Sequence, residues 1–257
     1  GTLSILAGTL DLNKYNLQLS GLTGCFVNEG TLKVVGTETL TGFVNDTDSG
    51  TINYYGTGVY SSLAAGSSYH NVLFNGASGA WTMQADMNCY DITITGSALN
   101  ANARAITVTG DWLNAGTFTP AGGVVNFTGT GSRSLTSGAS QFHDMIFNNA
   151  SGIWTLQDAL ACHGFTITAG EVKANGKAMT VSNGWSNYGT FTHGGNTVTL
   201  SGTVAQSVHS GGSAFNVLTI INNSDAGVTF TDRLVAVTLN ASRPVDGVKK
   251  ISFGEAS

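Results

Sequence analysis

The feature that most constrains this chain is a long internal repeat. The segment Tyr69–Asn75 (YHNVLFN) returns as Phe142–Asn148 (FHDMIFN), at a numbering offset of 142 − 69 = 73, and returns more loosely from Phe215. This repeat offset relates further aromatic, cysteine and glycine residues: Trp81 and Trp154, Cys89 and Cys162, Trp112 and Trp185, Gly129 and Gly202. Self-similarity at a fixed long period is typical of stacked repeat architectures.

The repeat sets the expected domain organisation. Two full copies run over 69–141 and 142–214, with partial copies at 1–68 and 215–241. The segment 242–257 departs from the pattern, since Arg243–Lys250 carries one of the two prolines and three of the ten basic residues. Terminal repeats need a covered edge. We therefore expect a solenoid over 1–241 and a cap or junction over 242–257.

Within each copy the short-range period is two. Stretches such as Ile92–Thr95 and Thr197–Leu200 alternate apolar and small polar residues, as half-buried strands do. The chain has 35 glycines, two prolines and 10% charged residues, a composition that favours strands and tight turns over helices. We predict an all-β, right-handed parallel β-solenoid with about three turns per repeat and about 24 residues per turn. An antiparallel sandwich is the second choice.

Stacking assigns structural roles to repeated positions. Asn75 and Asn148 are expected to close strands, because Asn tolerates left-handed backbone. The three cysteines, Cys25, Cys89 and Cys162, are expected to remain unpaired. The residues predicted to point into the core are Ile94, Val108, Phe127, Ile146, Ile167, Val181, Val198 and Leu200.

Charge and hydropathy exclude several partners. The net charge is −5 and the ten Lys and Arg residues are not clustered for a phosphate backbone, which argues against nucleic acid. No apolar run approaches the roughly 20 residues of a transmembrane helix. The turns Gly56–Gly58 and Gly129–Gly131 precede no helix that could bind phosphate, so no cofactor is expected.

Two segments resemble a known group of proteins. Gly8–Leu19 (GTLDLNKYNLQL) and Trp185–Phe191 (WSNYGTF), followed by Asn196–Gly202 (NTVTLSG), are similar to repeats of large secreted bacterial β-helix proteins. Autotransporter-type adhesins, filamentous surface proteins and phage tail proteins carry related repeats. The resemblance covers nearly the whole chain to about residue 241. It implies an extracellular solenoid whose partners are other copies, neighbouring surface or virion proteins, or glycans.

The sequence contains few of the residue patterns that are typical of a catalytic site. Paired carboxylates would indicate a glycan-cleaving solenoid. Five aspartates instead occur singly and do not recur at the repeat offset: Asp86, Asp91, Asp111, Asp144 and Asp158. His70 and His143 do recur at that offset, and repetition favours structural roles over a catalytic dyad for all five histidines. The chain is therefore expected not to be an enzyme, with a polysaccharide lyase or hydrolase as the alternative.

Other candidate sites remain open. Asp46 and Asp48 lie in an oxygen-rich loop that is a weak calcium candidate without a downstream bidentate Glu. Trp81, Trp112, Trp154 and Trp185 could stack on glycans or fill the core. Repeated Thr-x-Thr units such as Thr107/Thr109 admit an ice-binding face, although threonine is also an ordinary outward strand residue. The leading expectation is a non-catalytic structural or adhesive module, with a glycan-active solenoid and a self-stacking filament subunit as alternatives.

Overall fold

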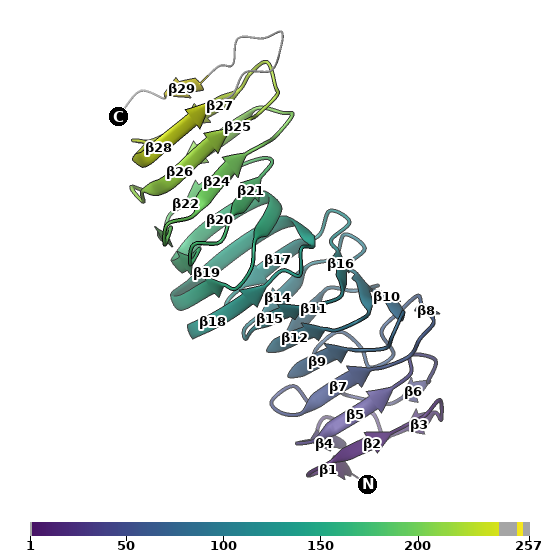
Figure 1. Ribbon diagram of the computed structural model, residues 1–257. Helices are drawn as coiled ribbons and strands as arrows, with labels where there is room; N and C mark the ends of the chain where they lie inside the picture. The colour runs from purple at the N-terminus through teal and green to yellow at the C-terminus, as the bar shows by residue number, and fades with distance from the viewer. Residues whose placement is uncertain (1, 242–250, 254–257) are drawn as a thin grey trace. The chain divides into compact units, whose positions relative to one another are not determined.

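The computed structural model describes residues 2–241 and 251–253, and these residues form strands and turns without a helix. Their backbone contacts divide the chain into two compact units, residues 1–123 (unit 1) and 124–257 (unit 2). Within each unit the strands lie side by side in parallel ladders (Figure 1). The predicted parallel β-solenoid class is confirmed.

Unit 1 has three stacks of parallel strands, one on each side of the turn. The first stack contains β2 (Thr9–Asp11), β5 (Thr31–Val34), β7 (Thr51–Tyr54), β9 (Asn71–Phe74), β12 (Asp91–Ile94) and β15 (Trp112–Asn114). The second contains β1 (Leu3–Ile5), β4 (Phe26–Asn28), β11 (Met87–Cys89) and β14 (Ile106–Val108), with β1 paired to β4 and β11 to β14. The third contains β3 (Leu17–Gln18), β6 (Leu40–Thr41), β8 (Val59–Tyr60), β10 (Ala80–Thr82), β13 (Ala98–Asn100) and β16 (Thr117–Thr119).

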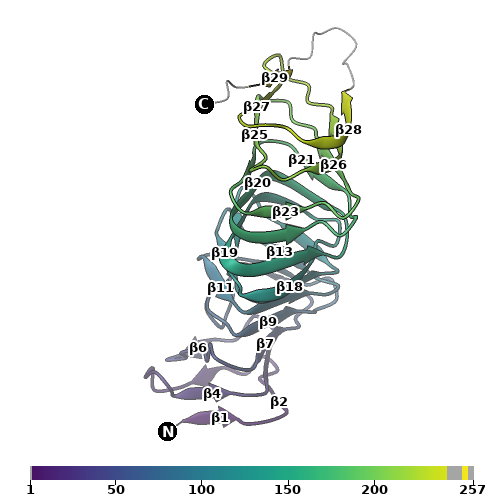
Figure 2. The same ribbon diagram turned by 90° about the vertical axis from the view of Figure 1, so that its left-hand side faces the viewer.

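Unit 2 repeats this plan, and Figure 2 shows its turns stacked on one another. Stack A contains β17 (Val124–Phe127), residues 144–147 of β19 (Gln141–Leu156), the middle of β20 (Leu160–Lys173), β22 (Trp185–Asn187), β25 (Gln206–His209), β27 (Val228–Phe230) and β29 (Ile251–Phe253). Stack B contains β18 (Gly131–Thr136), the ends of β19 and β20, and β23 (Thr190–Thr192). Stack C contains the first two residues of β19, the start of β20, β21 (Met179–Val181), β24 (Thr197–Leu200), β26 (Phe215–Ile220) and β28 (Ala236–Ala241).

The turns are shorter than expected. The register partners Thr31 and Thr51 are one turn apart, a numbering step of 51 − 31 = 20, and the step from Thr51 to Asn71 is the same. Among the register pairs within the described residues of each unit, the step ranges from 98 − 80 = 18 to 208 − 185 = 23. The predicted turn of about 24 residues was therefore wrong. It assumed that the repeat closes on a whole number of turns, whereas at a step of 20 an offset of 73 ends between three and four turns.

A fractional number of turns moves equivalent residues to different sides. Val125 and Val198 are related by the repeat offset, and both lie in unit 2. Val125 pairs with Met145 in stack A, whereas Val198 pairs with Met179 and Leu218 in stack C. The sequence repeat is therefore not the structural repeat. The structural repeat is a single turn of the solenoid.

The core follows the alternation in the strands. Seven of the eight predicted core residues are at most 1% exposed, the exception being Ile146, which lies on the outer face between the buried Met145 and Phe147. Aromatic rings stack from turn to turn inside unit 2, with centroids 4.8 Å apart for Phe127 and Phe147 and 4.5 Å apart for Phe165 and Trp185. Burial of this kind is the main stabilising contribution to a solenoid.

Asparagines close turns at positions other than those expected. Asn75 and Asn148 are exposed and do not have left-handed backbone, whereas Asn102 and Asn175, which are also related by the repeat offset, both have φ of 53°. The buried Asn187 accepts a hydrogen bond from the N–H of Gly189 and donates one to the carbonyl of Ser210 in the next turn. The side chain thus satisfies backbone groups that a tight corner leaves unpaired.

The predicted cap falls largely outside the described residues, which omit 242–250 and 254–257. The described part of this tail, β29, pairs in parallel with β27. Strand pairing in unit 2 therefore continues beyond residue 241.

None of the described residues forms a helix that is long and apolar enough to cross a membrane.

Candidate functional site

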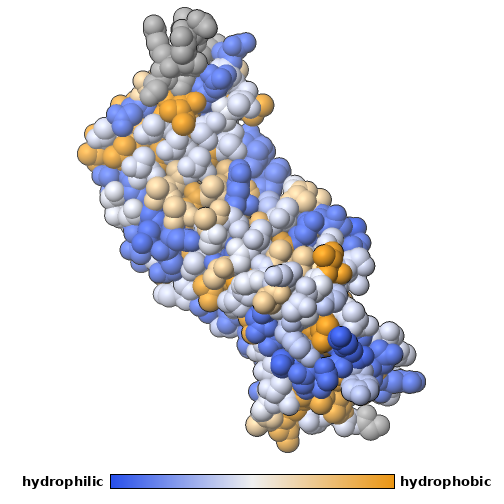
Figure 3. Space-filling view, turned by 45° about the vertical axis from the view of Figure 1, so that its right-hand side comes forward, coloured by the Kyte–Doolittle hydropathy of each residue, from blue (hydrophilic) through white to orange (hydrophobic). Residues whose placement is uncertain are grey.

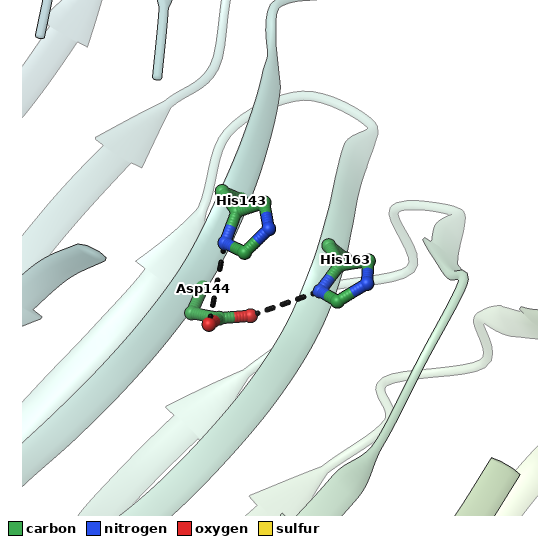
Figure 4. Close-up of side chains that lie close together, drawn as sticks. All are labelled: His143, Asp144 and His163. Carbon is green, nitrogen blue, oxygen red and sulfur yellow. Dashed lines mark hydrogen bonds and ion pairs between the residues drawn. The ribbon is translucent and has the colours of Figure 1, made fainter. Parts of the chain in front are cut away.

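Stacking at this turn length brings two histidines together in unit 2. His143 on β19 and His163 on β20 occupy one register position, between the pairs Phe142–Cys162 and Asp144–Gly164. Their rings are stacked, with centroids 4.4 Å apart and an angle of 16° between the planes. Asp144 follows His143 on the same strand, and its carboxylate lies between the two rings (Figure 4).

The carboxylate contacts both imidazoles. Nδ1 of His143 lies 3.2 Å from Oδ2 of Asp144, and Nδ1 of His163 lies 3.2 Å from Oδ1. The three side chains keep between about a third and a half of their surface exposed. Their donor atoms all lie within 4.8 Å of one another, the one such group of three metal-binding side chains among the residues that the structure describes. The arrangement can share protons between imidazole and carboxylate, or bind a cation.

Gly164 makes room for this carboxylate. A Cβ at position 164 would lie under 3.0 Å from Oδ1 of Asp144, which is closer than real contacts allow. The backbone of Gly164 does not have positive φ, so a side chain here would disturb the carboxylate rather than the backbone conformation. In the sequence, the two histidines are separated by 163 − 143 = 20 residues, which is one turn. This spacing predicts the cluster only if the turn length is known.

The equivalent position in unit 1 has the same geometry with different side chains. His70 stacks on Tyr90, with centroids 4.9 Å apart and planes 2° apart. At the repeat offset, Asn71 occupies the position equivalent to Asp144, and Tyr90 occupies the position equivalent to His163. His70 and His143 each stack on a ring of the next turn, which agrees with a structural role for these histidines. At His143 the stack also brings together three possible ligands, two imidazoles and a carboxylate.

Most other candidate acids contact backbone in a neighbouring turn. Asp86 accepts the N–H of Ala105 at 2.9 Å, and Asp91 accepts the N–H of Asp111 at 2.7 Å. Asp158 accepts the N–H groups of Ser137 and Gly138. These carboxylates satisfy turn donors, which is the structural reading made from the sequence.

The four tryptophans lie in the core. Trp81, Trp112, Trp154 and Trp185 are at most 1% exposed. A sugar stacks on an exposed ring face, so the glycan-stacking hypothesis for these residues was wrong and core filling was right. Period-two alternation puts each indole on the inner face of its strand, as at Trp81 between the half-buried Ala80 and Thr82.

The loop of Asp46 and Asp48 brings two carboxylates together. Asp46 accepts the N–H of Asn28 at 2.7 Å and that of Asp48 at 3.2 Å. Burial opposes ionisation of Asp46, but hydrogen bonds from the Asp48 side chain and from these N–H groups outweigh it and lower its pKa. The hydrogen bond to Asp46 and its negative charge raise the pKa of Asp48. Calcium takes six to eight oxygen ligands, and the expectation of no metal here, with Asp46 and Asp48 only as weak calcium candidates, stays a prediction.

A shallow groove of about 580 Å³ lies over β19 and β20 in unit 2. Glu171, Tyr188 and Thr190 line it. Tyr188 is 67% exposed, and its ring stacks on that of His209 with centroids 4.7 Å apart. The oxygen Oε1 of Glu171 accepts a hydrogen bond from Thr192 at 2.6 Å. An exposed aromatic ring beside a carboxylate is a combination that binds sugars.

Comparison of the chain with protein-family models, with curated proteins and with solved structures finds no match.

Proposed function

We propose that this chain is a non-catalytic structural or adhesive module of the extracellular kind that its repeats resemble, on a cell surface, a filament or a virion. One observation carries the proposal. In each unit, every turn adds parallel strands around a continuous apolar core. In unit 1, for example, Thr31, Thr51 and Asn71 are register partners in three successive turns. Such stacking gives a stiff body whose outer faces tolerate variation.

The acidic side chains support this proposal. A glycan-cleaving site needs two carboxylates that converge on one sugar bond, at separations of about 5 to 9.5 Å. Asp86, Asp91 and Asp158 are instead engaged with backbone N–H groups. Carboxylates held in this way stabilise turns and are poorly placed to exchange protons with a substrate.

A second candidate function is glycan binding at the groove of Glu171 and Tyr188. The specific observation is the exposed Tyr188 ring, which is the feature that the buried tryptophans lack. Sugar rings stack on such faces, and a shallow open groove suits a polymer better than a small molecule. This function is compatible with an adhesive module.

One experiment tests both functions. The purified chain is incubated with a panel of neutral and acidic polysaccharides, and both retention on immobilised glycan and release of new chain ends are measured. We expect no cleavage, and retention, where it occurs, that Tyr188→Ala weakens about tenfold. The exposed Tyr15, 76% exposed in unit 1, provides the control variant Tyr15→Ala. Cleavage that Asp144→Asn or Asp158→Asn abolishes would instead identify an enzyme.

A further inference from the structure

We propose that His143, Asp144 and His163 form a surface site for one divalent transition-metal ion of the zinc type. Two imidazoles and one carboxylate are a ligand set that late first-row divalent metals accept. The three groups come from two consecutive turns, β19 and β20 (Figure 4), so a bound ion would crosslink the turns.

The distances fit a coordination shell. Metal–nitrogen and metal–oxygen bonds of about 2.0–2.2 Å at angles near 90–109° separate neighbouring ligand atoms by about 2.9–3.5 Å. Each Nδ1 lies 3.2 Å from an oxygen of Asp144, within this range. The widest separation in the group is no more than 4.8 Å, and rotation of the half-exposed rings closes it.

The surroundings leave the site accessible and electrostatically suitable. No lysine or arginine in the described ranges 2–241 and 251–253 forms an ion pair with Asp144, whose carboxylate contacts the two histidines. The side chains of His143 and His163 are each 36% exposed, although the ligand atom Nδ1 of His143 is itself shielded from solvent. Three protein ligands leave positions for water or for a ligand from another molecule.

Gly164 leaves space for the carboxylate of Asp144 at this position. It is the register partner of Asp144, and a side chain there would push the carboxylate off the position it shares with both rings. In unit 1 the residue related to Gly164 by the repeat offset is Asp91, beside Asn71 and Tyr90. The chain therefore contains a matched comparison position, in which the ring stack is kept while the second imidazole and the aspartate next to the first are replaced.

The test is calorimetric titration of zinc chloride into the whole chain. We expect one ion per chain, and at least a tenfold weaker affinity in His163→Gln and in Asp144→Asn. Gly164→Ala keeps all three ligands but displaces the carboxylate, so it should also weaken binding. His70→Gln, at the equivalent stack in unit 1, is the matched control and should bind as the wild type does.

Folding is checked in each variant by circular dichroism and by thermal unfolding in the absence of metal. A wild-type chain that binds no zinc, or zinc binding that His163→Gln and Asp144→Asn leave unchanged, overturns the proposal. The reverse experiment installs the ligands in unit 1 with Asn71→Asp, Tyr90→His and Asp91→Gly together. We expect two ions per chain, and a folded triple variant that still binds one ion would contradict the geometric argument.

Discussion

Asp232 shows how single polar residues hold neighbouring turns together. Its carboxylate accepts the N–H groups of Ser210 at 2.8 Å and Gly211 at 2.7 Å, and the Ser210 hydroxyl at 2.8 Å. Asp158 makes the same three contacts with Ser137 and Gly138. The serines are related by the repeat offset, 210 − 137 = 73, but the aspartates by 232 − 158 = 74, so a search at a fixed offset misses the recurrence.

The Asp232 contacts predict a pH-dependent stability. Partial burial opposes ionisation, but the hydrogen bonds from Ser210 and Gly211 outweigh it and lower the pKa of Asp232, with a smaller contribution from His209. A lowered folded-state pKa contributes stability above the unfolded-state pKa of about 3.9, and this contribution is lost as the pH falls through the folded value. Asp232→Asn should therefore destabilise unit 2 by about 1–2 kcal/mol at neutral pH and by little near pH 2.

Urea denaturation at the two pH values measures this difference. Asp225→Asn, at an exposed position in the same turn, is the control and should change stability little at either pH. A difference for Asp232→Asn that is as large in acid as at neutral pH would show that the charge does not carry the effect.

At the scale of strands, burial alternates along each straight stretch and loses its phase where a strand runs on around a corner, as at residues 148–151 of β19. β19 and β20 are 16 and 14 residues long and continue from stack A to stack B, with register shifts after Phe147 and Asn148. The sequence predicted separate short strands of period two. The prediction for Ile146 was wrong because its apolar neighbours on both sides, Met145 and Phe147, take the inner face.

A charge on the inner face of a strand should disrupt the stack locally. Phe127 is 1% exposed and stacks on Phe147, so Phe127→Asp would bury an unpaired carboxylate and remove a ring contact. We expect a loss of at least about 3 kcal/mol and rapid cleavage in limited proteolysis. Asn126→Asp, on the outer face of the same strand, is the control. Equal protease resistance of the wild type and Phe127→Asp would refute the assigned facing of β17.

At the scale of the molecule, the turn rather than the sequence repeat is the structural unit. In unit 2, one buried residue from each successive turn lies next to the one before it along stack C. These residues are Phe142, Cys162, Val181, Leu200 and Ile220. Each turn contacts mainly its two neighbours, as in other solenoids. On the face shown in Figure 3, the exposed hydrophobic residues lie in small groups among hydrophilic ones.

Removal of one turn should therefore be tolerated. Deletion of residues 145–164 joins Asp144 to Phe165, and Phe165 is the register partner of the deleted Met145. The shortened chain should keep a strand-rich circular dichroism spectrum and cooperative urea unfolding. Deletion of only 145–154 removes half a turn and should abolish cooperative unfolding, because it places stack B residues against stack A. Similar behaviour of the two deletions would contradict the turn length.

The sequence by itself determined the strand-rich parallel solenoid, the inward facing of seven of the eight residues predicted for the core and the structural use of most aspartates. These follow from period-two alternation and from the repeat, which are local properties of the chain. Only the tertiary structure decided the turn length, because it depends on how corners such as those at Asn102 and Asn175 close. The turn length in turn decided that His143 and His163 stack, that Asp144 lies between them, and that residues related by the repeat offset occupy different sides.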